Sequence, residues 1–150
     1  MMSPQPTNSR EASLLIVDDD DIDAMALERS FQKMKLLNPR YRARDGQQAL
    51  DMLRAGTVPE PCIILLDLNM PRLSGLEFLK ILRSDPLFAD VVVFVLTTSK
   101  SDEDRIAAYR DHVAGYILKH RGSEGFLEVV TLIDRYWRIV ELPISGGLPS

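Results

Sequence analysis

The chain has 150 residues, of which 45% are hydrophobic and 27% are charged, and its formal net charge is −4. This composition predicts one globular domain with one core rather than a disordered chain, and the negative charge disfavours binding to nucleic acid. No apolar run approaches the roughly 20 residues that a membrane span requires, so we expect a soluble, cytoplasmic protein.

Both ends of the chain are predicted to be tails. Residues 1–10 are rich in Pro, Ser and Asn and lack the apolar core of a signal peptide, and residues 144–150 contain two glycines and a proline. The folded domain is therefore expected over residues 11–143. A single cysteine, Cys62, permits no internal disulfide, which agrees with a reducing cytoplasm.

Five short apolar runs predict β-strands. Four of them are continuous and rich in β-branched residues, as is usual for strands that helices cover on both faces. The remaining run, at residues 41–43, alternates with arginines and suits the edge of a sheet. In chain order, the predicted strands are residues 14–17, 41–43, 63–66, 91–96 and 116–118.

Segments with helical spacing lie between and after these strands. Alternating strands and helices joined by right-handed crossovers predict an α/β fold, a doubly wound five-stranded parallel sheet with strand order 2-1-3-4-5. The last helix is expected over residues 123–141. The residues that carry the spacing in the first four helices are Leu27, Phe31 and Met34; Ala49, Leu50 and Leu53; Leu76, Leu79 and Leu82; and Ile106, Tyr109, Arg110 and Val113.

Polar residues follow four of the predicted strands. Asp18 and Asp19 follow the first strand, Asp67 the third, Thr97 the fourth and Lys119 the fifth. In an open α/β sheet, ligands bind outside the carboxyl ends of the strands, near the point where the strand order switches. That point lies between the first and third strands here, so we expect the three carboxylates to meet there.

Three neighbouring carboxylates repel one another unless a cation neutralises them. Their oxygen ligands, without histidine or cysteine, favour Mg²⁺ over zinc or copper. Asp67, at the end of the central strand, could then attack a phosphoryl donor in line and form an acyl phosphate. The Lys119 ammonium and the Thr97 hydroxyl could each contact a phosphoryl oxygen.

The segments LLIVDDD, ILLDLNMPRLSG, VLTTS and GYILK, in this order and spacing, resemble the receiver domain of two-component response regulators. The resemblance implies a flavodoxin-like receiver fold and a phosphorelay function, with Asp67 phosphorylated by a sensor histidine kinase. It makes Asp18 and Asp19 the acidic pair and Asn69 a metal ligand through its backbone carbonyl. It also makes Thr97 the switch hydroxyl, Lys119 the phosphate-binding lysine, and Tyr116 the aromatic side chain that follows Thr97.

The last helix carries more apolar residues than one sheet-facing stripe needs. Phe126, Val130, Ile133, Trp137 and Val140 are expected to face the sheet or to continue beyond it as a seam, and Leu132, Tyr136 and Ile139 form a second face. The tail YWRIVELP resembles small stand-alone regulators that accompany bacterial phytochrome kinases. That resemblance implies a bacteriophytochrome partner and a homodimer through the fourth helix, fifth strand and fifth helix, with Trp137, Tyr136 and Ile139 in the interface. Alternatively, Trp137 and Ile139 fold back over the fourth helix.

Several alternatives remain at this stage. Asp20, Asp21 and Asp23 are interpreted as carboxylates at the N-terminus of the first helix. His120 stands where receivers usually have proline, which leaves the reach of Lys119 open, and we interpret it as an exposed loop residue. An aspartyl-phosphate phosphatase would need a general acid where Asn69 stands, and a binding-only module would keep the fold without phosphorylation.

Overall fold

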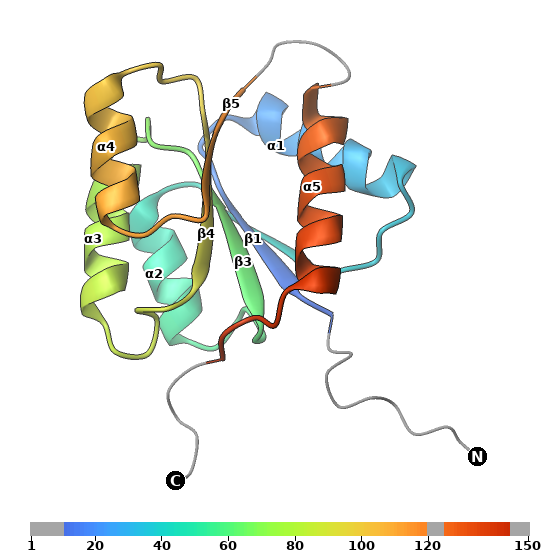
Figure 1. Ribbon diagram of the computed structural model, residues 1–150, viewed down its shortest axis with the longest axis horizontal. Coiled ribbons are helices and arrows are strands. Elements are labelled where there is room, and N and C mark those ends of the chain that lie inside the picture. The colour runs from blue at the N-terminus through green and yellow to red at the C-terminus, as the bar shows by residue number, and fades with distance from the viewer. Residues whose placement is uncertain (1–10, 120–124, 145–150) are drawn as a thin grey trace, which may run out of the picture.

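The computed structural model describes residues 11–119 and 125–144, in which five parallel strands alternate with five helices (Figure 1). The strand order is β2-β1-β3-β4-β5, which confirms the predicted doubly wound sheet. Most of the two predicted tails, and His120, lie outside the described residues. The elements in chain order are β1 (Ser13–Val17), α1 (Asp21–Lys33), β2 (Arg40–Ala43), α2 (Gly46–Arg54), β3 (Cys62–Leu66), α3 (Gly75–Ser84), β4 (Val92–Thr97), α4 (Asp102–Arg110), β5 (Gly115–Leu118) and α5 (Gly125–Ile139).

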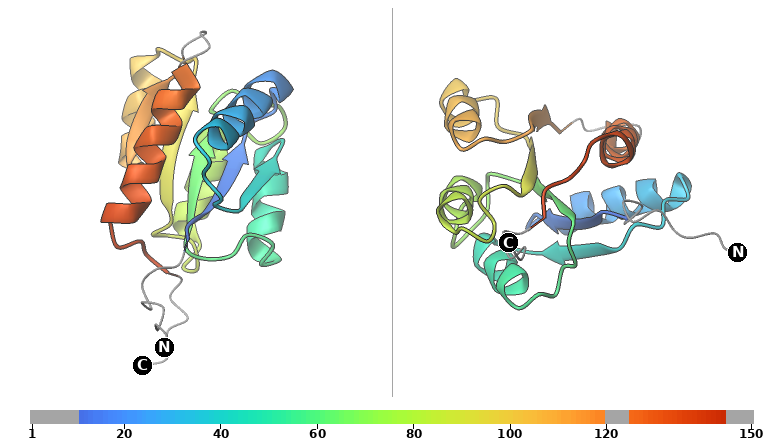
Figure 2. Two further views of the ribbon diagram at one scale, coloured as in Figure 1. Left: turned by 90° about the vertical axis from the view of Figure 1, so that its right-hand side faces the viewer. Right: turned by 60° about the horizontal axis from the view of Figure 1, so that its bottom comes forward.

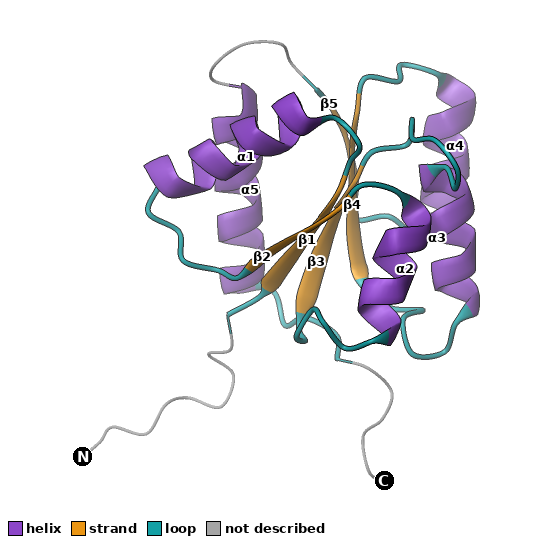
Figure 3. Cartoon of the chain, turned by 180° about the vertical axis from the view of Figure 1, so that it is seen from behind, coloured by secondary structure: helices purple, strands orange, loops and turns teal. Residues whose placement is uncertain are grey.

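Helices cover both faces of the sheet. Helices α1 and α5 lie side by side on one face, whereas α2, α3 and α4 lie on the other (Figures 2 and 3). Successive side chains of a strand point to opposite faces, so each face has its own core. Leu14 and Ile63 pack toward α1 and α5, while Leu15 and Ile64 pack toward the other three helices. This two-sided burial explains why β1 and β3 are continuous apolar runs.

The parallel register brings the strand ends level with one another. Val17 of β1 is paired with Leu66 of β3, and Leu66 with Val95 of β4. Thr97, the last residue of β4, is paired with Leu118 of β5. The residues that follow these strands therefore emerge at the same edge of the sheet.

Helix α4 is weakly anchored compared with its neighbour α3. It buries a single residue, Ala108, whereas α3 buries four. Ile106 and Tyr109, which carried the helical spacing in the sequence, are 52% and 48% exposed. The helix itself is confirmed, but its sheet-facing residue is small, and its larger apolar side chains point outward.

Helix α5 buries a broader stripe than its sequence spacing suggested. Tyr136, expected on the second face, packs edge-on against Phe94 of β4 with ring centroids 5.0 Å apart. Trp137 is half-buried against the same core, whereas Ile139 is 80% exposed. Val140, expected to face the sheet, follows the helix and is exposed. The helix buries Phe126, Val129, Val130 and Ile133.

Within residues 11–119 and 125–144, none of the helices combines the length and the apolar character that crossing a membrane requires.

Candidate functional site

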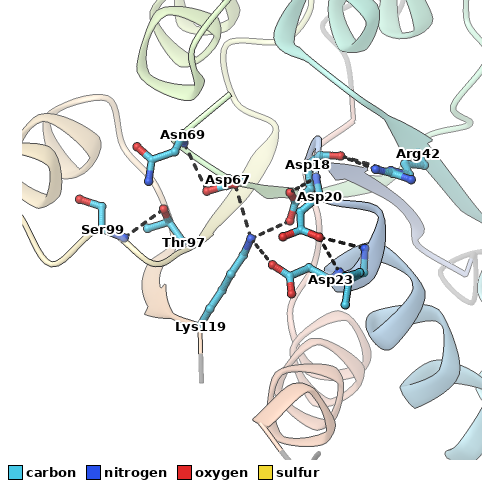
Figure 4. A network of polar contacts seen from close by, with 10 residues as sticks. Asp18, Asp20, Asp23, Arg42, Asp67, Asn69, Thr97, Ser99 and Lys119 are labelled. Carbon is cyan, nitrogen blue, oxygen red and sulfur yellow. Dashed lines mark hydrogen bonds and ion pairs between the residues drawn. The ribbon is translucent and has the colours of Figure 1, made fainter. Parts of the chain in front are cut away.

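The predicted site residues converge at the carboxyl edge of the sheet (Figure 4). The backbone ladder continues one residue beyond the central strands, because the Asp67 amide donates to the Val17 carbonyl at 2.9 Å. Beyond β5, the Lys119 amide donates to the Thr97 carbonyl at 2.8 Å. These bonds hold the start of each site loop to the rigid sheet.

Three carboxylates gather at the switch point, as the sequence predicted. One oxygen from each of Asp18, Asp19 and Asp67 lies within 4.8 Å of the other two. Asp18 and Asp67 are buried and Asp19 is exposed, so the group opens to solvent on one side. A group made only of carboxylate oxygens fits a hard divalent cation such as Mg²⁺ or Mn²⁺.

Burial dominates the electrostatics of Asp18. It raises the pKa of Asp18 to about 6, although hydrogen bonds from the Lys119 ammonium and the Asp20 amide act in the opposite direction. A bound divalent cation would favour the charged carboxylate and so lower this pKa. A cation bound at these carboxylates would therefore offset the electrostatic cost of burying Asp18.

Lys119 lies at the centre of the acidic residues, with a side chain that is only 5% exposed. Its Nζ lies 2.9 Å from Asp18 Oδ2, 2.8 Å from Asp23 Oδ2 and 3.5 Å from Asp67 Oδ2. Burial alone would lower the pKa of Lys119, but the hydrogen bonds to Asp23 and Asp18 outweigh it and raise this pKa above its usual value. The ammonium is therefore charged, and it reaches the Asp67 carboxylate.

The contact of Asp23 with Lys119 was missed by the sequence interpretation. Asp20 does cap α1, and Asp21 forms an ion pair with Arg42 at 2.6 Å. Asp23, which had been grouped with them, instead points at Lys119. Side chains of a helix tilt toward its N-terminus, so a carboxylate in the first turn of α1 points back to the edge of the sheet.

Arg42 of β2 holds the loop that carries the acidic pair. Its guanidinium donates to the Asp18 carbonyl from two nitrogens, at 2.9 and 3.2 Å, and to Asp21 of α1. The edge strand therefore restrains the chain on both sides of Asp19, through the Asp18 backbone and the Asp21 side chain.

A chain of hydrogen bonds leads from Thr97 to α4. The Ser99 amide donates to Thr97 Oγ1 at 3.3 Å, and the Tyr116 hydroxyl donates to the Ser99 carbonyl at 3.0 Å. The Ser99 hydroxyl donates to Asp104 of α4 at 2.6 Å. Ser99, which the sequence interpretation did not single out, therefore links the two predicted switch residues to a helix.

The loop after Asp67 is closely packed. The backbone amide of Asn69 donates to Asp67 Oδ1 at 3.3 Å, which orients the Asp67 carboxylate. The Gly75 amide donates to the Leu68 carbonyl at 3.1 Å. A Cβ atom at Gly75 would lie 2.6 Å from Leu68 Cα and would also clash with the Asp67 carbonyl oxygen. Only glycine fits where α3 meets this loop.

A doubly wound parallel sheet with carboxylates at its switch point is suited to binding a cation and a phosphoryl group there. Residues 14–131 match the family model of the response regulator receiver domain. The chain therefore belongs to the response regulator receiver family, which acts in two-component signalling.

Similar proteins include two response regulators of which this chain covers nearly the whole length. The response regulator Rcp1 of Synechocystis sp. is 32% identical over 137 residues, which cover 88% of this chain and 93% of Rcp1. The crystal structure of Mn²⁺-bound Rcp1 has a TM-score of 0.78 at 31% identity, covering 88% of this chain and 99% of that one. The phosphorylated cyanobacterial phytochrome response regulator RcpA has a TM-score of 0.81 at 29% identity, covering 89% and 99%.

Proposed function

We propose that this chain is a stand-alone response regulator that accepts a phosphoryl group on Asp67 from a sensor histidine kinase. The observation that carries the proposal is the buried Asp67 carboxylate, which lies beside two further carboxylates and the Lys119 ammonium. An Asp67 oxygen forms the new P–O bond while the P–N bond to the kinase imidazole breaks and the imidazole leaves.

Asp18, Asp19 and Asp67, with the Asn69 backbone carbonyl, are the proposed ligands of Mg²⁺. When bound, this ion would neutralise charge on the phosphoryl oxygens. Lys119 donates from Nζ to one phosphoryl oxygen and Thr97 donates from Oγ1 to another. The position two residues after Asp67 holds an amide, which cannot act as the general acid of a phosphatase.

Phosphorylation adds a charge of about −1.5 to −2 at neutral pH. We propose that the Thr97 hydroxyl turns to this charge and so changes its contact with the Ser99 amide. Tyr116 of β5 and Asp104 of α4 both form hydrogen bonds with Ser99. A movement of Ser99 would therefore reach β5 and α4. A bacteriophytochrome-type kinase is the proposed partner, which the likeness to a phytochrome response regulator supports.

Beryllofluoride, a mimic of the phosphoryl group, is expected to bind the protein at one site and only in the presence of Mg²⁺. The Asp19→Asn variant should lose roughly tenfold or more in Mg²⁺ affinity, because one of three carboxylate ligands is gone. Calorimetric titration measures both constants. Asp51→Asn, which removes an exposed carboxylate from α2, is the matched control. A wild-type protein that binds neither Mg²⁺ nor beryllofluoride would contradict the proposal.

We also propose a homodimer through α4, β5 and α5, with Trp137, Tyr136 and Ile139 in its interface. Its support is the exposure of Ile139, together with the outward apolar side chains of α4 and the position of β5 at the edge of the sheet.

Sedimentation is expected to detect dimers at tens of micromolar, and Ile139→Ser should shift the protein toward monomer, because the apolar area buried between the copies shrinks. Ile22→Ser, which changes an equally prominent side chain on α1, should leave the dimer intact. Observation of monomer alone for the wild type would rule out this assembly.

A further inference from the structure

The contact of Asp23 with Lys119 has no part in the proposed phosphoryl transfer. Asp23 is not one of the clustered metal-site carboxylates, yet its oxygen lies 2.8 Å from Lys119 Nζ, closer than the 3.5 Å to Asp67. Figure 4 shows that Asp23 approaches Nζ from α1, whereas Asp67 approaches it from the centre of the sheet. The two carboxylates therefore share one ammonium group, which they approach from different sides.

We propose that Asp23 is a positioning residue that holds the Lys119 ammonium toward α1 in the unphosphorylated protein and so limits how strongly Lys119 binds the phosphoryl group. This inference rests on the proposed phosphorylation of Asp67. It assigns a regulatory role to a side chain outside the metal and acceptor positions.

The number of N–H donors on the Lys119 ammonium supports the proposal, because an incoming phosphoryl group would have to displace one of the present partners. A lysine ammonium has three N–H donors, and three carboxylates already surround Lys119 Nζ. A phosphoryl group on Asp67 brings new oxygen acceptors, so Nζ has to give up a present partner or share a donor.

Asp23 is the partner that is easiest to release. Its side chain is 19% exposed, compared with 4% for Asp18 and 7% for Asp67, so water can solvate the Asp23 carboxylate once Lys119 has left it. Asp18 is buried, so water cannot take the place of the Lys119 ammonium there as it can at Asp23.

The negative charge of Asp23 is also expected to weaken the binding of an anion at Asp67. The Asp23 carboxylate places a further negative charge beside the position of an incoming anion, and it neutralises part of the charge on Lys119. An amide at this position keeps the shape of the side chain but removes both effects. Loss of one partly exposed ion pair corresponds to roughly a 1.5- to fivefold change in the affinity for the anion.

The test compares beryllofluoride affinity at saturating Mg²⁺ in the wild type, Asp23→Asn and Asp20→Asn, by ¹⁹F NMR or calorimetry. Asp23→Asn is expected to bind beryllofluoride roughly 1.5- to fivefold more tightly. Asp20→Asn removes one charge from the same loop, and Asn also serves as a helix cap, so its affinity should equal that of the wild type. In a Lys119→Met background, the effect of Asp23→Asn should be smaller than in the wild type, because only the direct repulsion between Asp23 and the anion is left to remove.

The other possible results for Asp23→Asn also have a definite meaning for the role of Asp23. Weaker binding by Asp23→Asn would mean that Asp23 orients Lys119 for the phosphoryl group, and unchanged binding would mean that the ion pair is structural only; both results overturn the inference. Asp23→Ala, with folding checked by thermal melting, guards against an effect specific to the amide. A wild type that binds Mg²⁺ but no beryllofluoride contradicts the proposed function itself, which distinguishes that failure from the failure of this inference.

Discussion

Replacing Asp67 with Asn is expected to reduce covalent labelling by radioactive acetyl phosphate, or by a cognate histidine kinase, to below detection. An amide has no anionic oxygen that can attack phosphorus, and the neighbouring carboxylates Asp18 and Asp19 are proposed to be occupied by the metal ion. Wild-type labelling should depend on Mg²⁺ and should be removed by hydroxylamine, as expected of an acyl phosphate. Phosphate retained on the gel band after acid denaturation measures the effect.

The matched control for this variant is Asp45→Asn. Asp45 is also a buried carboxylate, but it caps α2 and accepts a hydrogen bond from the Gln48 amide, which Asn can replace. Labelling should persist in this variant. Labelling that survives in Asp67→Asn, with an unchanged melting temperature, would show that another residue is the phosphoacceptor.

Gly75→Ala is expected to destabilise the domain by about 1–3 kcal/mol and to slow labelling, because the added methyl group overlaps backbone rather than a flexible side chain. The start of α3 cannot easily move away, since Ser74 and Glu77 form a capping box there. The atoms that must shift instead belong to Asp67 and Leu68. Urea denaturation and the initial rate of labelling measure the two effects.

Gly56→Ala separates this steric effect from the general cost of replacing glycine. Gly56 has a φ of +73°, and apart from its chain neighbours no atom lies within 4 Å of the position of a Cβ, so its substitution adds backbone strain of about 1 kcal/mol without a clash. It should leave the labelling rate unchanged. A Gly75→Ala protein that is as stable as the wild type would show that the loop after Asp67 tolerates a displacement.

The fold could be predicted from the sequence because the buried strands are unbroken apolar runs, and alternation with helices leaves few possible topologies. The orientation of α4 could not be predicted in the same way. Ile106 and Tyr109 have the spacing of a buried stripe, but only Ala108 is buried. Which side of a short helix meets the sheet depends on the three-dimensional position of its ends, and periodicity does not report that position.

In the candidate site too, some features could be predicted from the sequence and others could not. Asp18, Asp67, Thr97 and Lys119 could be located because each ends or directly follows a strand, and parallel strands end at one edge. The contact between Asp23 and Lys119 joins residues 96 positions apart, on a helix and after a strand. No local pattern specifies such a pair, although the tilt of side chains in a first helical turn indicates where Asp23 points.

The weak anchoring of α4 has a consequence for the energetics of signalling. The single buried methyl group of Ala108 contributes about 1 kcal/mol, whereas the buried Phe and Leu side chains of α3 contribute several times more. We therefore expect α4 to be displaced at a lower free-energy cost than α3, while the sheet and α3 stay in place. Among the described helices, α4 is therefore the one that we expect to move most easily, and it begins a few residues after Thr97.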